Sequence, residues 1–250
     1  MATHIVTGGS AGIGLAIARR LAADGHELVL VARRRGPLEE AAAALAAEGT
    51  SVTVADLDVR DAEAVGRLVD GLPAVDGVVN NAAGNFACPA VDLSPNGFRA
   101  VVEISLYGCF HFSTAVARRL IAEDRPGAVL NIVATYAWTG APGVSHSAAA
   151  KAGMVAFTKS VAREWAPHGI RVNALAPGFV PTENAVAGLL PTEDARTRML
   201  SHIPLGRFAD AAEVAEPASF LMSDRASYIT GSVLTADGGR SLGQALHEPR

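Results

Sequence analysis

The segment Thr7-Gly8-Gly9-Ser10-Ala11-Gly12-Ile13-Gly14 joins a short apolar run, residues 4–7, to a segment of helical period. Glycines between a strand and a helix allow the backbone to approach a pyrophosphate at the helix N-terminus. Glycines also close ordinary tight turns, so the position directly after a strand decides the interpretation. We expect a dinucleotide to be framed by Gly8, Ser10, Ala11, Gly12, Ile13 and Gly14.

The pattern around this segment repeats along the chain. Runs rich in β-branched residues alternate with longer Ala-rich segments of helical period. The predicted strands are residues 4–7, 27–31, 51–55, 77–80, 128–133 and 170–175, and the predicted helices include 94–121, 145–166 and 210–222. Strands with so little polar alternation are covered on both faces. The sequence predicts an α/β fold: a single Rossmann-like, doubly wound parallel sheet with helices on both faces, forming one domain over residues 1–250.

The composition and net charge of the chain indicate which classes of binding partner to expect. The chain has 250 residues, half of them hydrophobic, and a net charge of −4. Without a long Lys/Arg run, we expect no nucleic-acid partner and no anionic membrane surface. No secretory signal, no apolar run near membrane length, no C-terminal Ser-Lys-Leu and only two cysteines are seen, so we expect a cytoplasmic protein. We expect no metal site.

The end of the second predicted strand indicates which cofactor binds. It reads Val31-Ala32-Arg33-Arg34-Arg35, without the carboxylate that normally holds the ribose 2′-hydroxyl of NAD. Arg33 and Arg34 can instead offer fork-shaped donors to a 2′-phosphate. The alternative is three solvated arginines at the start of a helix. We predict NADPH.

Further motifs carry a family resemblance. Asp58-Val59, Asn80-Asn81-Ala82-Ala83-Gly84, Lys151 and the segment 177–182 resemble the short-chain dehydrogenase/reductase family over essentially the whole chain. The resemblance implies that Asp58 and Val59 meet the adenine and that Asn80 lies beside the adenine ribose. It also implies that Val180 and Thr182, after Pro177 and Gly178, hold the nicotinamide carboxamide, and that Lys151 binds the nicotinamide ribose.

The chain departs from the ketone-reducing pattern of that family at three positions. Ser147 stands where the tyrosine of a Tyr-x-x-x-Lys pair would be, Ala134 replaces a serine and Ser105 replaces an asparagine. The segments 80–86, 135–138 and 145–153 resemble the 2,4-dienoyl-CoA reductase branch instead. That resemblance implies that Asn85 and Tyr136 donate hydrogen bonds to a thioester carbonyl. It also implies that Ser147 and Lys151 fix the nicotinamide end of NADPH.

The expected reaction is NADPH-dependent reduction of a conjugated 2,4-dienoyl-CoA, or a related enoyl thioester, to a 3-enoyl thioester by 1,4-hydride addition. Charge then develops on the thioester oxygen, which needs preorganised donors. A proton goes to carbon, which we ascribe to water. Two alternatives remain: a ketone/alcohol oxidoreductase with Tyr136 as the acid, and a catalytically silent NADPH-binding sensor or assembly subunit.

Several residues around the predicted site are less specific. Phe86 and Trp138 could wall an acyl pocket or belong to the core, and His146 is expected to be solvated. Residues 177–204 are expected to form a substrate lid, with an ordinary surface excursion as the alternative. The sequence does not single out a cation for coenzyme A among Arg99, Arg196, Arg198 and Arg207. The family resemblance implies a homotetramer that assembles through the helices near 95–121 and 145–166.

Overall fold

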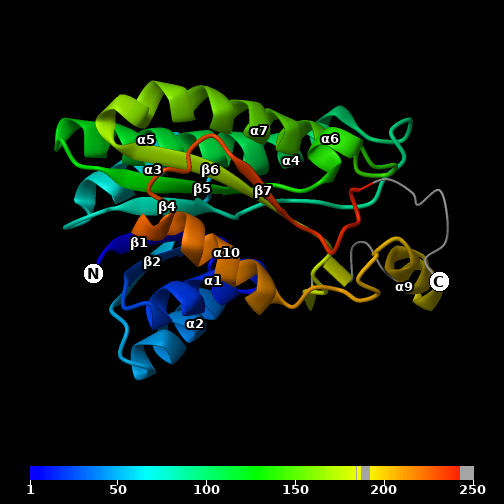
Figure 1. The fold of residues 1–250 in the computed structure, drawn as a ribbon, viewed down its shortest axis with the longest axis horizontal. Coiled ribbons are helices and arrows are strands. Elements are labelled where there is room, and N and C mark those ends of the chain that lie inside the picture. Colours follow the sequence, from blue (N-terminus) through cyan, green and yellow to red (C-terminus); the bar gives the residue numbers. More distant parts are fainter. Residues whose placement is uncertain (184, 187–191, 243–250) are drawn as a thin grey trace.

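The computed structural model describes residues 1–183, 185–186 and 192–242. Its seven strands form one parallel sheet in the order β3-β2-β1-β4-β5-β6-β7 (Figure 1). They are β1 (Thr3–Thr7), β2 (Glu27–Ala32), β3 (Val52–Asp56), β4 (Gly77–Asn80), β5 (Gly127–Ile132), β6 (Ile170–Pro177) and β7 (Val233–Ala236). The winding direction reverses between β1 and β4, and ligands bind open α/β sheets at the carboxyl end of such a switch point.

Helices connect the strands and cover the sheet. They are α1 (Gly12–Ala23), α2 (Arg35–Ala47), α3 (Ala62–Gly71), α4 (Pro95–Val102), α5 (Gly108–Ala122), α6 (Tyr136–Thr139), α7 (Ser145–Trp165), α9 (Glu193–Ser201) and α10 (Ala211–Met222). A π-helical turn, Glu103–Tyr107, joins α4 to α5, and short 3₁₀ turns cover Ala166–His168 and Asp224–Ala226.

Alternation along the strands explains the two layers. Helices α1, α2 and α10 cover one face of the sheet, and α3, α5 and α7 cover the other (Figure 1). Val6 and Leu30 pack in the cluster on the first face, and Ile5 and Val29 in the cluster on the second. All four side chains are buried. Successive strand residues face opposite sides, so a strand that is apolar at every position requires helices on both sides. The doubly wound architecture predicted from the sequence is confirmed.

The long helical run needs a correction to the sequence analysis. Pro95–Ala122 spans 28 residues and is apolar enough to cross a membrane by length and composition, although no such run was expected. Phe112, Val116 and Leu120 of this run are fully buried in the core with strands of the sheet. The run is therefore a layer of the α/β fold in this structure.

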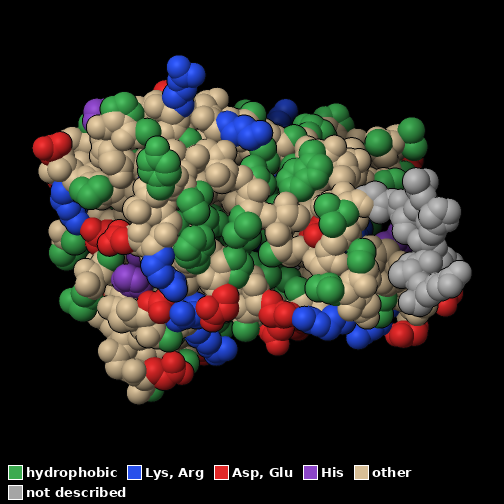
Figure 2. All heavy atoms as spheres, viewed as in Figure 1, with side chains coloured by type: hydrophobic (Ala, Val, Ile, Leu, Met, Phe, Trp, Pro, Cys, Tyr) green, Lys and Arg blue, Asp and Glu red, His purple; other side chains and the backbone are tan. Residues whose placement is uncertain are grey.

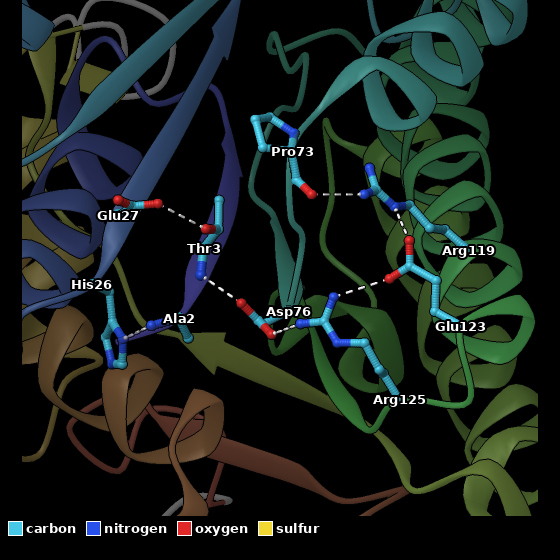
Figure 3. A network of polar contacts seen from close by, with 9 residues as sticks. All are labelled: Ala2, Thr3, His26, Glu27, Pro73, Asp76, Arg119, Glu123 and Arg125. Carbon is cyan, nitrogen blue, oxygen red and sulfur yellow. Dashed lines mark hydrogen bonds and ion pairs between the residues drawn. The ribbon is translucent and has the colours of Figure 1, made fainter.

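The amino ends of the strands are fastened by a polar network (Figure 3). The Asp76 carboxylate, just before β4, accepts a 2.7 Å hydrogen bond from the Thr3 amide and is ion-paired with Arg125. Arg125 also meets Glu123, which is paired with Arg119 at 2.8 Å. Because these residues sit at the end of the sheet opposite the glycine-rich turn, the network stabilises the fold without occupying the ligand edge.

Candidate active site

The glycine-rich turn is held in a shape that favours glycine. Gly8 and Gly12 have φ of +66° and +55°. A Cβ on Gly14 would lie 2.3 Å from the Gly8 carbonyl oxygen and 2.5 Å from Asn81 Nδ2. The Thr7 hydroxyl accepts hydrogen bonds of 3.0 Å from the amides of Asn81 and Ala82. The turn is thus tied to the end of β4, across the switch point.

The first helix begins without a side-chain cap. Its N-cap residue is Ala11, which makes no capping hydrogen bond. Uncapped amides at a helix N-terminus carry partial positive charge and suit a phosphate. A Cβ on Gly12 would lie 2.9 Å from Thr182 Cγ2, so the segment after β6 closes over this turn. The backbone therefore forms a cradle that fits the pyrophosphate of a dinucleotide.

A groove of about 1410 Å³ runs along the carboxyl edge of the sheet from this cradle. The cofactor residues predicted from the sequence that line it are Gly8, Ser10, Ala11, Gly12, Ile13, Arg33, Arg34, Asp58, Val59, Val180 and Thr182. Gly14 lies beneath the turn against Asn81. Pro177 ends β6, and Gly178 lines a second groove. Most of the predicted cofactor set is thus brought together by the fold.

The three arginines that follow β2 differ in their ion pairs. The Arg35 guanidinium is paired with Glu39 at 2.7 Å and Asp56 at 3.5 Å. Arg33 and Arg34 are exposed and make no ion pair within the described part of the chain. They line the groove, so both guanidinium groups are positioned to receive a phosphate. The residues present fit NADPH.

Asp58 is engaged by a neighbour on the same turn. Its carboxylate accepts hydrogen bonds from the Arg60 guanidinium, the shortest at 2.6 Å. These bonds, and to a smaller extent the charges of Arg60 and Arg33, lower the pKa of Asp58 despite its partial burial. Asp58 is therefore an anion with fixed geometry at the groove edge.

Asn80 lies elsewhere than expected from the family resemblance. Its side chain is buried and donates 2.8 Å hydrogen bonds to Ser113 and Asn131. Asn131 in turn donates to Thr158. This network ties β4 and β5 to α5 and α7, and Asn80 does not line the groove. Asn81 lines it instead.

The predicted catalytic residues meet where β5 ends and α7 begins. The Tyr136 hydroxyl is 3.0 Å from Ser147 Oγ. Lys151, one turn further along α7, donates a 2.6 Å hydrogen bond to the Ile132 carbonyl at the end of β5. Ser147 and Lys151 are buried, whereas Tyr136 is half-buried. The structure therefore brings three of the four predicted residues together.

Burial sets the protonation of this group. It raises the pKa of Tyr136, an effect that the Ser147 hydrogen bond and the charge of Arg240 partly offset. It lowers the pKa of Lys151 to about 8, against a small opposing effect of Cys109. At neutral pH Tyr136 is a neutral donor and Lys151 remains mostly cationic. The pair suits stabilisation of a developing oxyanion.

Asn85, the fourth predicted residue, is less fixed. It is exposed, in a segment without helix or strand that is joined to the loop before α7 by the hydrogen bond from the Cys88 amide to the Gly143 carbonyl. Phe86 and Trp138 are 38% and 47% exposed, so neither is a core residue. Trp138 lines the second groove, of about 840 Å³, with Phe179 and Leu205.

His146 was expected to be solvated, and this is wrong. Its side chain is fully buried in the first turn of α7, and neither ring nitrogen has a hydrogen-bond partner in the described residues. The Phe86 ring lies against it, with ring centroids 4.5 Å apart. A histidine in the first turn of a helix is normally exposed to solvent. Here the apolar segment that contains Phe86 folds over the side chain of His146.

The predicted lid, residues 177–204, includes α9, and the turn that leads to α10 follows it. Residues 184 and 187–191 lie outside the described residues. Arg196 of α9 and Arg207 line the cofactor groove, and the Arg207 guanidinium is held by Glu213 at 2.7 Å. Arg196 lies over the Phe208 ring, 5.3 Å from its centroid. This segment therefore forms one wall of the groove.

Comparison with known proteins is decisive for the family. A family model described as "Enoyl-(Acyl carrier protein) reductase" matches residues 8–241. The chain belongs to the short-chain dehydrogenase/reductase family. Within this family it is 42% identical to a Bacillus subtilis protein named "Probable 2,4-dienoyl-CoA reductase [(2E)-enoyl-CoA-producing]", over 95% of this chain and 96% of that one.

Other members of the short-chain dehydrogenase/reductase family are similar in sequence or structure. A zebrafish "Peroxisomal 2,4-dienoyl-CoA reductase [(3E)-enoyl-CoA-producing]" is 37% identical over 96% of this chain and 81% of its own. A short chain dehydrogenase from Bacillus anthracis superposes with a TM-score of 0.89 at 40% identity, covering 98% of both chains. A gluconate 5-dehydrogenase from Burkholderia cenocepacia, solved with NADP and tartrate, has a TM-score of 0.92 at 30% identity, covering 97% of this chain and 96% of that one. The family membership makes this chain an oxidoreductase with a nicotinamide-cofactor fold.

Proposed function

We propose that this protein is an NADPH-dependent reductase of a conjugated 2,4-dienoyl-CoA that forms a 3-enoyl thioester. The observation that carries the proposal is the 3.0 Å contact between the Tyr136 hydroxyl and Ser147. Ser147 stands at the position of the usual tyrosine, and the phenol reaches it from α6 instead. A donor moved in this way suits an enolate oxygen better than the proton relay of a ketone reductase. Relatives named as dienoyl-CoA reductases support the substrate class.

Each residue has a separate task in the proposed reaction. NADPH supplies a hydride when bound. Tyr136, kept neutral by burial, donates a hydrogen bond to the thioester oxygen as negative charge develops on it, and Asn85 is the second donor. Lys151, held by the Ile132 carbonyl, binds the nicotinamide ribose and contributes positive potential. Ser147 orients the phenol.

Arg33 and Arg34 give the proposed preference for the phosphorylated cofactor. They line the groove and are free of ion pairs in the described residues, whereas Arg35 is already paired. Solved family members that hold NADP support this choice. We also propose a cytoplasmic location, which the two free thiols Cys88 and Cys109 support, because disulfides belong chiefly to oxidising compartments.

The decisive experiment follows the loss of NADPH absorbance on adding trans-2,trans-4-decadienoyl-CoA to the purified protein. Controls are a matched 2-enoyl-CoA, a 3-ketoacyl-CoA, and NADH in place of NADPH. We expect rapid oxidation of NADPH with the diene alone and a 3-enoyl product. If no thioester causes oxidation of NADPH, the proposal is refuted. The alternative of a catalytically silent NADPH-binding sensor or assembly subunit would then remain.

One observation favours a second candidate, oxidation or reduction of an alcohol/ketone pair. The similar solved structures include a gluconate 5-dehydrogenase. In that reaction Tyr136 would act as the acid, directly beside Ser147. Turnover of the 3-ketoacyl-CoA or of a polyol, with none of the diene, would favour this candidate.

A homotetramer is part of the proposal as well. Phe98, Tyr107 and Phe110, on the run from α4 to α5, are 41%, 52% and 48% exposed. Large apolar side chains gathered on one helical run are typical of an interaction surface. Figure 2 shows further hydrophobic side chains over α7 and the edge strand β7. We propose that subunits associate through these apolar side chains.

A further inference from the structure

Among the described residues, four arginines line the cofactor groove: Arg33, Arg34, Arg196 and Arg207. Arg33 and Arg34 follow β2 and are assigned to the ribose 2′-phosphate. The Arg207 guanidinium donates two 2.7 Å hydrogen bonds to the Glu213 carboxylate, which neutralises its charge. Arg196, on α9, makes no ion pair with the described residues. Its positive charge is therefore available to a ligand in the groove.

An aromatic stack holds the Arg196 guanidinium at the wall of the groove. Its Cζ lies 5.3 Å from the centroid of the Phe208 ring, and that ring packs on Phe179 with centroids 5.1 Å apart. A guanidinium above a ring keeps the N–H groups at its edge free for hydrogen bonds. Because Arg196 and Phe208 both line the groove, the stack presents a cation with free donors to the molecule that occupies it.

The packing of α10 beside α1 places this stack next to the glycine-rich turn (Figure 1). The Arg20 guanidinium meets Glu216 at 2.7 Å, and the Ser219 hydroxyl donates to the Asp24 carboxylate. Residue numbers rise in the same direction along both helices across these two contacts, so the helices run parallel and their first turns lie together. Phe208 lies just before α10, as the glycine-rich turn lies just before α1. The guanidinium stacked on Phe208 is therefore close to the pyrophosphate cradle.

The glycine-rich turn supplies only part of the charge that a pyrophosphate needs. The uncapped amides at the start of α1 act as roughly half a positive charge, whereas each phosphate of a dinucleotide carries a full negative charge. Three carboxylates that repel a phosphate also line the groove, those of Asp58, Glu183 and Asp210. A cation without a carboxylate partner offsets this repulsion, and Arg196 provides it.

We propose that Arg196 binds the pyrophosphate of the bound nicotinamide cofactor and thereby fastens α9 to the cofactor. The inference rests on the cofactor of the proposed function. The glycine-rich turn holds the phosphates through backbone amides, and Arg196 holds them through its guanidinium from α9. Since Arg196 lies in the first half of α9 (Glu193–Ser201), this helix is held in place more firmly once the cofactor is bound.

The first test measures the dissociation constant for NADPH by fluorescence titration, without substrate. We expect Arg196→Ala to raise it about 10- to 100-fold, the range for loss of charge-assisted hydrogen bonds. Adenosine 2′-monophosphate, which has the 2′-phosphate but no pyrophosphate, should bind this variant as tightly as it binds the wild-type protein. Arg33→Ala should weaken the binding of both ligands. The two variants together assign each arginine to a different part of the cofactor.

Arg198→Ala is the matched control. Arg198 lies on the same helix and is exposed, but it is not among the described residues that line either groove. Its loss should leave the dissociation constant for NADPH unchanged. Arg196→Lys keeps a positive charge but loses the planar stacked group, so it should recover part of the affinity. Thermal unfolding without NADPH checks that each variant is folded.

Hydrogen–deuterium exchange of α9 separates a bond to the cofactor from a general effect of charge. In the wild-type protein, saturating NADPH should slow exchange of the α9 amides, because the cofactor holds this helix through Arg196. In Arg196→Ala, saturating NADPH should still slow exchange in the glycine-rich turn but leave α9 unchanged. Equal protection of α9 in the variant and the wild-type protein overturns the proposed fastening.

The outcomes separate this inference from the proposed function. If Arg196→Ala binds NADPH like the wild-type protein, the inference is overturned. Arg196 would then be assigned to coenzyme A if the variant raises KM for the dienoyl-CoA but not for the dienoyl thioester of N-acetylcysteamine, which has no phosphate. A wild-type protein that binds no NADPH overturns both the inference and the proposed cofactor. Weaker NADPH binding by the variant, in a protein that does not reduce the diene, supports the inference and refutes the proposed substrate.

Discussion

Tyr136 and Ser147 share a hydrogen bond, but their surroundings give them different tasks. Burial raises the pKa of the phenol, so Tyr136 donates without ionising across the neutral range. Ser147 is almost fully buried at the start of α7, where its hydroxyl meets the Tyr136 phenol. In the proposed reaction, the oxygen that accepts a hydrogen bond from Tyr136 would be that of a thioester.

Tyr136→Phe should retain the fold and lose turnover. Removal of one oxyanion donor typically reduces the turnover number by roughly 100- to 1000-fold. We expect this loss with the dienoyl thioester, while the dissociation constant for NADPH changes little. Steady-state kinetics and fluorescence titration measure the two quantities. Near-normal turnover by this variant would contradict the assignment of Tyr136.

Arg33→Ala should weaken NADPH binding and leave NADH binding unchanged. A charge-assisted hydrogen bond contributes roughly 1.5–3 kcal/mol, which corresponds to a roughly 10- to 150-fold rise in the dissociation constant. Arg35→Ala is the matched control, since Arg35 belongs to the same arginine run but is paired with Glu39 and Asp56. If both variants raise the dissociation constant for NADPH equally, the weaker binding comes from the loss of positive charge in general and not from the loss of a specific contact with the phosphate.

Individual residues also show where sequence interpretation ends. Asn80 stands at a strand end, and nothing in the sequence says whether its amide faces the groove or the helices. It faces Asn131 and Ser113 in the core. His146 was missed for a related reason, because its burial depends on Phe86, sixty residues earlier. Arg33, Tyr136 and Lys151 could be predicted as site residues because each lies at a fixed distance along the chain from a recognisable motif, and their roles remain predictions.

Among the elements, the turn between β1 and α1 is the most constrained. Gly14 has no room for a side chain, because its Cβ would overlap Gly8 O and Asn81 Nδ2. Gly14→Ala should therefore destabilise the fold by about 1–3 kcal/mol and abolish stabilisation by NADPH. Thermal unfolding with and without NADPH checks both effects.

Gly36→Ala provides the control for this element. Gly36 lies in the first turn of α2, where nothing lies within 4 Å of an added Cβ. It should keep the wild-type stability and response to NADPH. A wild-type response in Gly14→Ala would show that the turn can rearrange.

The elements differ in how well the sequence predicts them. Strands β1 to β6 are long or continuous enough in apolar residues to be recognised. Strand β7 (Val233–Ala236) is no shorter than β4, but it was missed because it is a partly exposed edge strand between turn-forming segments, whereas β4 is buried throughout. The π-helical turn Glu103–Tyr107 was read as part of one long helix, since its composition resembles that of its neighbours. Local composition does not specify a change of hydrogen-bond register.

For the whole molecule, Tyr107→Glu should convert the proposed tetramer to smaller species. Tyr107 is 52% exposed on the run from α4 to α5, and a charge there would be costly to bury between subunits. Light scattering after size-exclusion chromatography measures the mass. Tyr228→Glu, at a fully exposed tyrosine, is the matched control and should not change it. A monomeric wild-type protein would contradict the assembly.

The stability of the whole molecule should also depend on pH through His4. Burial, and then the charge of His26, lowers the pKa of His4 from 6.5 to about 4. Between these values the unfolded chain binds a proton that the folded chain does not, so acid favours unfolding. We expect the free energy of unfolding to fall by up to about 3 kcal/mol as the pH drops from 6.5 to 4. Urea titrations measure this, and an equal fall in His4→Leu would contradict it.

The polar fastening in Figure 3 has a practical consequence for engineering. Asp76, Thr3 and Arg125 secure the amino ends of the strands, while the cofactor turn and Tyr136 occupy the opposite edge. The side chains that stabilise the amino ends of the strands are therefore separate from those of the candidate active site. In engineering for new substrates, stabilising substitutions can therefore be made first among the residues of the Asp76 network. The added stability would offset destabilising substitutions at the candidate active site.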